Sequence, residues 1–268
     1  MSEDPSPTQP SLGGVQAVGR ALDVLEALAA AEVPLGISEI AATTGLPVGT
    51  VHRLLRTLGE RGYARQEPDR KYAPGPVFAH LWASALRALT EPADRYLSRL
   101  SALTGQTASL AVLDGDQVAY AAQARPPRQT HTFAHVGAHV LPHCTAVGKV
   151  LLAFRSAPVV HGLVERNGLP SRTVRTVTSR AGLLAELDQV RHTGYAVDAE
   201  EQEDGVRCLA VPVTAAGAVV AAISVSGPTE HITRVDEHDL VATMQAVSHA
   251  FSSQVLSPAP RRTRPAQP

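Results

Sequence analysis

The chain has 268 residues, 44% hydrophobic and 18% charged, with a formal net charge of −1 at pH 7. This length and composition are typical of a globular protein with two domains, and two cysteines are too few for a disulfide-stabilised scaffold. The acidic N-terminus lacks a secretory signal, and no apolar stretch approaches the roughly 20 residues that span a bilayer. We therefore expect a cytoplasmic protein that does not contact a membrane.

Proline-rich segments at both ends, residues 1–14 and 257–268, predict disordered tails. The ordered sequence begins near Val15 with an expected helix. Its apolar face is defined by four residues at helical spacing, Val18, Leu22, Leu25 and Ala29. A second, short helix is expected over residues 39–44, with Ser38 as its N-cap and Gly45 in the left-handed conformation at its end.

A third helix is expected from about Val48 to Arg61. Its buried face is formed by Val51, Leu54, Leu55 and Leu58. Residues 62–66 and 71–73 flank a proline-aspartate turn, which predicts a β-hairpin. Three helices followed by a hairpin predict a winged helix-turn-helix domain over residues 15–76.

The outward face of the third helix and the hairpin carry side chains suited to DNA binding. A helix of this kind lies in the major groove, where arginine forms paired hydrogen bonds with guanine and hydroxyls reach bases or phosphates. The hairpin tip is placed to enter the minor groove or bind phosphates. The expected DNA-binding residues are Ser38, Gly49, Thr50, His52, Arg53, Arg56, Arg65, Arg70 and Lys71. The alternatives are an ordinary solvated helix face or a winged helix that docks proteins.

Residues 77–93 predict a linker helix, and residues 94–256 predict a larger effector-binding domain. The expected strands in the larger domain are 107–113, 117–122, 130–136, 206–213 and 219–226, and the expected helices include 94–104, 145–154, 159–166 and 235–255. Strands in hairpins flanked by helices indicate an antiparallel sheet with helices packed on it. The expected fold class is α+β.

Several separate motifs resemble those of the IclR family of bacterial transcription regulators. In the head they are residues 37–41, 45–47, 50–55 and 58–63, and in the second domain residues 146–149, 194–201, 205–208 and 224–228. The resemblance implies a winged helix-turn-helix joined by a linker helix to a GAF-like α/β domain. It also implies a transcription regulator that responds to a small organic effector, often a carboxylate. Because one head reads only a short half-site, we expect a homodimer or homotetramer that acts as a repressor on pseudo-palindromic operator DNA.

Two departures from the family pattern stand out. Gly49 replaces the usual serine of the DNA-reading helix, and Pro142 is displaced by one position from the family's Leu-Pro-Leu-His segment. The first removes an expected hydroxyl contact to DNA. The second is expected to reshape the loop at the mouth of the effector pocket.

The resemblance also implies where the effector binds. The residues that match its pocket are Ala146, Val147, Asp198, Val206, Cys208 and Ser224. Thr145 is expected to cap a helix whose first amides face an anion. Asp198 would repel a bare carboxylate, so we expect it to meet a hydroxyl or amine of the ligand, or an N–H of the surrounding protein. No cofactor is expected.

Two alternatives use other residues of the second domain. His131, His135, His139 and His143 recur at every fourth position, and Cys144 follows the last of them. On a helix they would align as metal ligands and suggest a metal-responsive regulator, although a strand over 130–136 would separate them. A cysteine-dependent hydrolase would use Cys208 as nucleophile with His143 and Asp198, but Cys208 lies in an apolar run without a nucleophile elbow.

Overall fold

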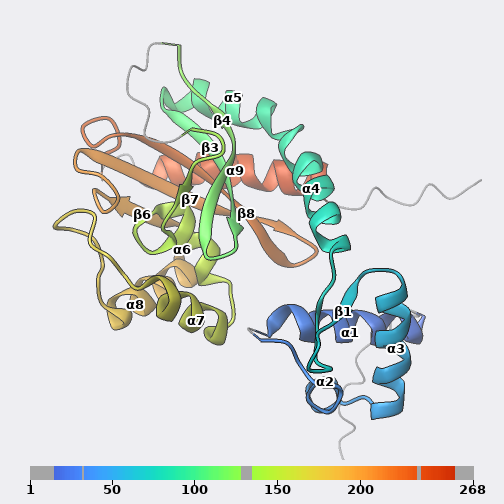
Figure 1. Cartoon of the computed structure of the whole chain (residues 1–268). Helices are drawn as coiled ribbons and strands as arrows, with labels where there is room; N and C mark the ends of the chain where they lie inside the picture. Colours follow the sequence, from blue (N-terminus) through green and yellow to red (C-terminus); the bar gives the residue numbers. More distant parts are fainter. Residues whose placement is uncertain (1–14, 32, 128–134, 234–236, 257–268) are drawn as a thin grey trace, which may run out of the picture. The chain divides into compact units, whose positions relative to one another are not determined.

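The computed structural model describes residues 15–31, 33–127, 135–233 and 237–256. The chain divides into two compact units, with the boundary between Ser84 and Ala85 (Figure 1). This boundary falls inside helix α4 (Val77–Thr90). Each unit has a hydrophobic core of its own.

The first unit is a winged helix-turn-helix. Its elements are α1 (Gln16–Ala30), α2 (Ile37–Thr44), α3 (Val48–Glu60), β1 (Ala64–Gln66) and β2 (Tyr72–Pro74). The two strands pair in antiparallel fashion, and Leu35 forms an additional bridge to Tyr72. Val24, Ile40 and Leu55, one from each helix, are fully buried together at the centre. Gly45 ends α2 with φ of 68°, a conformation that costs glycine little and permits the tight turn into α3.

Two sequence expectations for this unit are wrong in detail. Ser38 is not the N-cap of α2, because the helix already begins at Ile37 and the Glu39 carboxylate accepts the Gly36 N–H at 2.6 Å. The apolar face expected for α1 is also wrong, because Val18 and Leu22 are 56% and 51% exposed. Helix α1 carries two apolar stripes, and a single chain buries the one formed by Val24, Ala27 and Leu28.

The second unit is built on a six-stranded antiparallel sheet with strand order β5-β4-β3-β8-β7-β6. The strands are β3 (Thr107–Asp114), β4 (Gln117–Ala124), β5 (His139–Val140), β6 (Ala196–Ala199), β7 (Val206–Ala215) and β8 (Ala218–Pro228). The helical elements are α5 (Ala93–Thr104), η1 (Pro142–Cys144), α6 (Ala146–Ala153), α7 (Ala157–Asn167), α8 (Arg180–Thr193), α9 (Glu237–Phe251) and the π-helical turn η2 (Ser252–Leu256).

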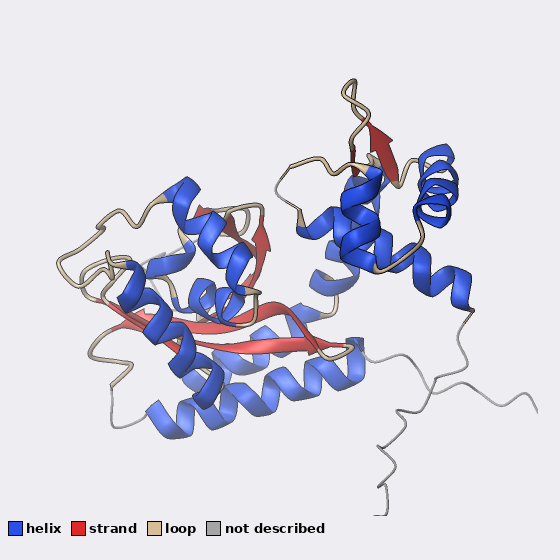
Figure 2. Ribbon diagram, turned by 90° about the horizontal axis from the view of Figure 1, so that it is seen from below, coloured by secondary structure: helices blue, strands red, loops and turns tan. Residues whose placement is uncertain are grey.

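Helices cover both faces of this sheet (Figure 2). Because side chains alternate along a strand, Leu209 and Val211 of β7 pack on α5 and α9, whereas Ala210 packs on the layer of α6, α7 and α8. Helix α6 is buried along its whole length and contacts β6, β7 and β8. The floor of any site under α6 is therefore made by every second residue of these strands.

Strands β5 and β6 were not expected from the sequence, since both are short and lie at the edges of the sheet. The expected strand 130–136 falls mainly outside the described residues, and His135 and Val136 are not in a strand. Across the described part of the chain, no helix has the length and apolar character to cross a bilayer.

Candidate DNA-binding surface and effector site

Helix α3 presents a polar face to solvent because its apolar residues lie on the other side. Val51, Leu55 and Leu58 are buried, whereas His52 and Arg53 are exposed. The expected DNA-binding residues Ser38, Gly49 and Arg56 are also exposed, and Thr50 is half-buried. Arg56 lies 4.0 Å from Glu60, but Arg53 forms no ion pair with a described residue.

The hairpin between β1 and β2 holds three further basic residues away from the core. Arg70 at the tip has φ of 65° and is exposed. The Asp69 carboxylate accepts the Lys71 N–H at 3.2 Å, which shapes the turn. Arg65 lies 2.8 Å from Glu67 and is partly neutralised. The first unit therefore carries both the exposed arginines of α3 and a basic hairpin. That each of these residues contacts DNA stays a prediction.

In the second unit, the expected effector residues converge beneath the first turn of α6. Asp198 pairs with Cys208 across β6 and β7, and both side chains point to the α6 layer, as does Ser224 of β8. The cap prediction for Thr145 is confirmed, because its Oγ1 accepts the Gly148 N–H at 3.3 Å. Ala146, Val147 and Val206 are buried, as are all the others except the half-buried Cys208.

Small residues make room under this helix. A side chain at Gly148 would place its Cβ 2.2 Å from the Pro142 carbonyl oxygen, so only glycine lets η1 lie this close to α6. Ser109 of β3 pairs with Ser224 of β8, and Ser226 lies two residues further along β8 on the same face. Short hydroxyl side chains on a sheet under a helix N-terminus are suited to a small polar ligand.

The electrostatics of this site favour neutral side chains. Burial raises the pKa of Asp198 to about 7, although its Oδ1 accepts the Glu201 N–H at 2.7 Å. Burial also raises the pKa of Cys144 to about 12 and that of Cys208 well above its usual value. Both thiols are therefore protonated near neutral pH and act as weak hydrogen-bond donors, Cys144 toward Gln202 Oε1 at 2.9 Å.

Several residues of this site were missed from the sequence. Burial raises the pKa of Tyr120. Asp198 and the two cysteines lie near it, and their negative charges, when they are ionised, raise its pKa further. The Ser226 hydroxyl hydrogen-bonds to Cys208. Ser226 could have been predicted from the sequence, because it follows Ser224 by two residues in a strand and therefore lies on the same face of the sheet. Tyr120 carried no comparable signal, because a bulge in β3 and β4 changes the register beside it.

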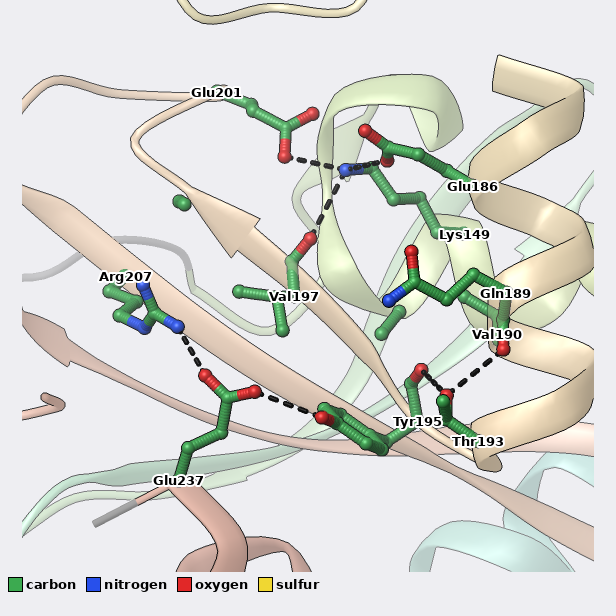
Figure 3. A pocket seen from close by; sticks show the side chains of 12 residues that line it. Lys149, Glu186, Gln189, Val190, Thr193, Tyr195, Val197, Glu201, Arg207 and Glu237 are labelled. Atoms are coloured by element: carbon green, nitrogen blue, oxygen red, sulfur yellow. Dashed lines mark hydrogen bonds and ion pairs between the residues drawn. The ribbon is translucent and has the colours of Figure 1, made fainter. Parts of the chain in front are cut away.

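An open pocket of about 530 Å³ lies along the edge strand β6 (Figure 3). None of the seven expected effector residues lines it. Its upper wall holds Lys149, whose Nζ lies 2.5 Å from both Glu201 and Glu186 and donates to the Val197 carbonyl at 3.1 Å. At the lower wall, Glu237 accepts hydrogen bonds from Tyr195, at 2.9 Å, and from Arg207. Since these charges pair with one another and cover the strand edge, we assign the pocket a structural role.

The metal-responsive alternative has no support in the described residues, which contain no group of three or more His, Cys, Asp or Glu side chains placed to hold a metal ion. His131 lies outside the described residues. His135 is exposed, His139 pairs with Asp114 at 2.9 Å, and His143 is buried in η1 beside Cys144. The histidines are dispersed because the chain passes from a loop into an edge strand and then into η1.

The hydrolase alternative is wrong. Cys208 is paired with a serine, and His143 Nε2 donates to the Pro170 carbonyl at 3.1 Å rather than to a nucleophile. Asp198 accepts backbone amides of the loop after β6. The imagined triad is therefore not assembled, and a thiol with a raised pKa is a poor nucleophile.

A winged helix-turn-helix with an exposed arginine helix, joined to an α/β domain with a buried polar site, defines a ligand-controlled DNA-binding regulator. Comparison with known proteins agrees with this class. The IclR helix-turn-helix domain matches residues 17–68, and the bacterial transcriptional regulator IclR C-terminal domain matches residues 84–253. The chain belongs to the IclR family of bacterial transcription regulators, whose members bind operator DNA and small-molecule effectors and are not enzymes.

Individual relatives cover most of the chain. The HTH-type transcriptional regulator KdgR of Dickeya chrysanthemi is 35% identical over 245 residues, 90% of this chain and 80% of that protein. The transcriptional repressor IclR of Escherichia coli is 33% identical over 235 residues, 84% of this chain and 85% of that protein. The solved inducer-binding domain of PobR from Acinetobacter, a double mutant in complex with 3-hydroxybenzoic acid, matches with a TM-score of 0.58 and 30% identity over 61% of this chain and 97% of that chain. The expected family and fold class are confirmed.

Proposed function

We propose that this protein is a homo-oligomeric cytoplasmic repressor that leaves its operator when a small carboxylate binds between α6 and the sheet. The observation that carries the proposal is the group of polar side chains under the first turn of α6, formed by the buried Asp198, Ser224 and Ser226 and the half-buried Cys208. The amides of Ala146 and Val147 precede the first intrahelical hydrogen bond and are available to an anion. The likeness to a domain solved with 3-hydroxybenzoic acid supports a carboxylate ligand.

Asp198 fits an acid ligand when it is protonated. With its pKa raised to about 7 by burial, a large fraction of the protein carries a neutral Asp198 that donates a hydrogen bond. Of the partners expected for Asp198, the protein N–H is present, since Oδ1 accepts the Glu201 N–H at 2.7 Å. The raised pKa adds a carboxylate oxygen of the ligand to the hydroxyl and amine expected from the sequence. A neutral carboxylic acid at this place binds either a hydroxyl or a carboxylate oxygen.

Self-association is supported by apolar side chains that a single chain leaves exposed. Val15, Val18 and Leu22 form a stripe on α1 with exposures of 70%, 56% and 51%, and Leu81 and Trp82 of α4 are exposed by 42% and 44%. Large apolar residues in this arrangement are typical of a protein interface. One winged helix reads a short half-site, so two heads related by symmetry supply the affinity for a pseudo-palindromic operator.

The function is tested by genome-wide footprinting of the purified protein, followed by mobility-shift titration of the strongest site. We expect a pseudo-palindromic site, loss of the complex when a small acid such as 3-hydroxybenzoate or the acid of the neighbouring pathway is added, and increased transcription of the adjacent gene in a deletion strain. Binding of random and genomic DNA with equal affinity would contradict the proposal. Decreased transcription in the deletion strain would show an activator instead.

A further inference from the structure

The segment between α7 and α8 contains a loop that is hydrogen-bonded to two walls of the effector site, η1 and the loop after β6. We name residues 170–176 the strap. At its start, the Pro170 carbonyl accepts a hydrogen bond from His143 Nε2 at 3.1 Å, which ties the strap to η1. Burial lowers the pKa of His143, so this imidazole is neutral near pH 7.

The other end of the strap is tied to the loop after β6. The Thr173 hydroxyl donates to the Glu200 carbonyl at 2.7 Å, and the Thr176 hydroxyl donates to the Glu201 carbonyl at 2.7 Å. Arg175 adds an ion pair with Glu200 at 2.7 Å. Since η1 carries Cys144 and the loop after β6 follows Asp198, the strap joins the two walls of the site.

Arg172 lies within the strap, and its backbone is held firmly. Its N–H donates to Thr176 Oγ1 at 2.9 Å, as does the N–H of Thr173. Its side chain is exposed and forms no ion pair with a described residue. Arg172 stands in the chain between Pro170, whose carbonyl is hydrogen-bonded to His143 of η1, and Thr173, whose hydroxyl is hydrogen-bonded to the Glu200 carbonyl after β6, so the strap holds it beside both walls of the site. Its positive charge also lowers the pKa of the Cys144 thiol, which burial and two carboxylates raise.

A carboxylate that enters this site needs a positive partner. Glu201 is buried beside it, and the only buried ammonium among the described residues, Lys149, is already shared by Glu201, Glu186 and the Val197 carbonyl. The partial charge of the α6 N-terminus is about half an elementary charge. Among the described residues beside the site, Arg172 is a cation without an acidic partner, and a guanidinium binds a carboxylate through two parallel hydrogen bonds.

We propose that Arg172 pairs with the carboxylate group of the effector and selects acids over neutral compounds of the same shape. The proposal rests on the effector site proposed above. The strap holds the backbone of Arg172 in place before the ligand arrives, which lowers the entropic cost of binding. Arg175, three residues further along the same strap, is paired with Glu200 and has no such role.

The test is calorimetric titration of the full-length protein with four acids, 3-hydroxybenzoate, benzoate, succinate and lactate, and with the neutral 3-hydroxybenzyl alcohol. Arg172→Gln is compared with the wild type, with the conservative Arg172→Lys and with the matched control Arg175→Gln. We expect Arg172→Gln to weaken acid binding by about 10- to 100-fold, the effect of one charged, hydrogen-bonded pair, and Arg172→Lys to restore part of it. Arg175→Gln should leave acid binding within about threefold of the wild type.

The outcomes separate this inference from the proposed function. If the wild type binds an acid and Arg172→Gln binds it equally well, the role of Arg172 is refuted while the effector site stands. Equal losses of acid affinity in Arg172→Gln and Arg175→Gln would show that both substitutions act by disturbing the fold of the strap, and this result would also refute the role of Arg172. If the wild type binds none of the acids, the carboxylate class itself fails, and the pairing with Arg172 fails with it.

Discussion

The Nζ of Lys149 lies 2.5 Å from Glu201 Oε1, although the two residues are 52 positions apart in the chain. Lys149 is 1% exposed and Glu201 6% exposed, so this is a buried ion pair. Glu186 of α8 shares the same ammonium at 2.5 Å. One lysine therefore joins α6, α8 and the loop that follows β6, and it holds the wall of the proposed effector site next to Asp198.

Removing one partner of a buried pair leaves the other charge uncompensated in a medium that solvates it poorly. We therefore expect Lys149→Met to lower the free energy of unfolding by roughly 3–5 kcal/mol. Urea unfolding followed by circular dichroism measures this. The double variant Lys149→Met/Glu201→Gln should recover part of the loss, whereas Arg56→Met, which breaks the exposed pair with Glu60, should cost less than about 1 kcal/mol. A loss below about 1 kcal/mol in Lys149→Met would contradict the assigned role.

The raised pKa of Asp198 predicts how stability depends on pH. In the unfolded chain this carboxyl loses its proton near the ordinary value of 3.8, and in the folded chain near 7. Between these values the folded state binds a proton that the unfolded state does not, so stability decreases as pH rises and the penalty is complete above about pH 7. Relative to wild type, Asp198→Asn should gain roughly 2–3 kcal/mol between pH 5 and pH 8.

This comparison is made by denaturant unfolding of both proteins at several pH values. Only the difference between them is informative, because Glu201, His143 and the other titrating groups are common to both. Asparagine keeps the oxygen that accepts the Glu201 N–H, so the substitution preserves the local hydrogen bond. Parallel stability profiles for the two proteins would show that Asp198 has an ordinary pKa.

Arg53 is expected to read a base in the major groove. Arg53→Ala should weaken binding to the footprinted operator by about 1–3 kcal/mol and should affect random DNA less. Fluorescence anisotropy with both DNAs measures the two losses at one salt concentration. Arg155→Ala, an exposed arginine of the second unit, is the matched control and should change neither. Equal losses on both DNAs would assign Arg53 to a phosphate contact.

The exposed stripe of α1 is expected to lie in the interface between two copies of the chain. Leu22→Glu should shift the protein toward monomers in sedimentation velocity and weaken operator binding, because a buried charge without a partner is costly. Its stability as a monomer should change little, since Leu22 is 51% exposed in a single chain. Val174→Glu, at a residue 94% exposed in the second unit, should leave the oligomeric state unchanged. An unaltered mass distribution for Leu22→Glu would place the interface elsewhere.

Local patterns in the sequence were sufficient for most of the helices and hairpins. The end of α2 at Gly45, the cap of α6 at Thr145 and the hairpin at residues 114–117 depend on a few neighbouring residues, whose conformational preferences act without help from the rest of the chain. The short edge strands β5 and β6 escaped prediction because two to four residues carry too little periodicity. Motifs resembling one family then pointed to the class of regulator and to the location of its site.

The sequence by itself determined most helices and hairpins and which strand residues share a face, because these follow from spacing along the chain, and its motifs indicated the class of protein. Only the tertiary structure decided which apolar stripe of α1 is buried, that Lys149 is shared by two distant carboxylates, and that the strap ties η1 to the loop after β6. These relationships join residues that are far apart in the chain. Their energies depend on burial and on distances in space, which no local spacing specifies.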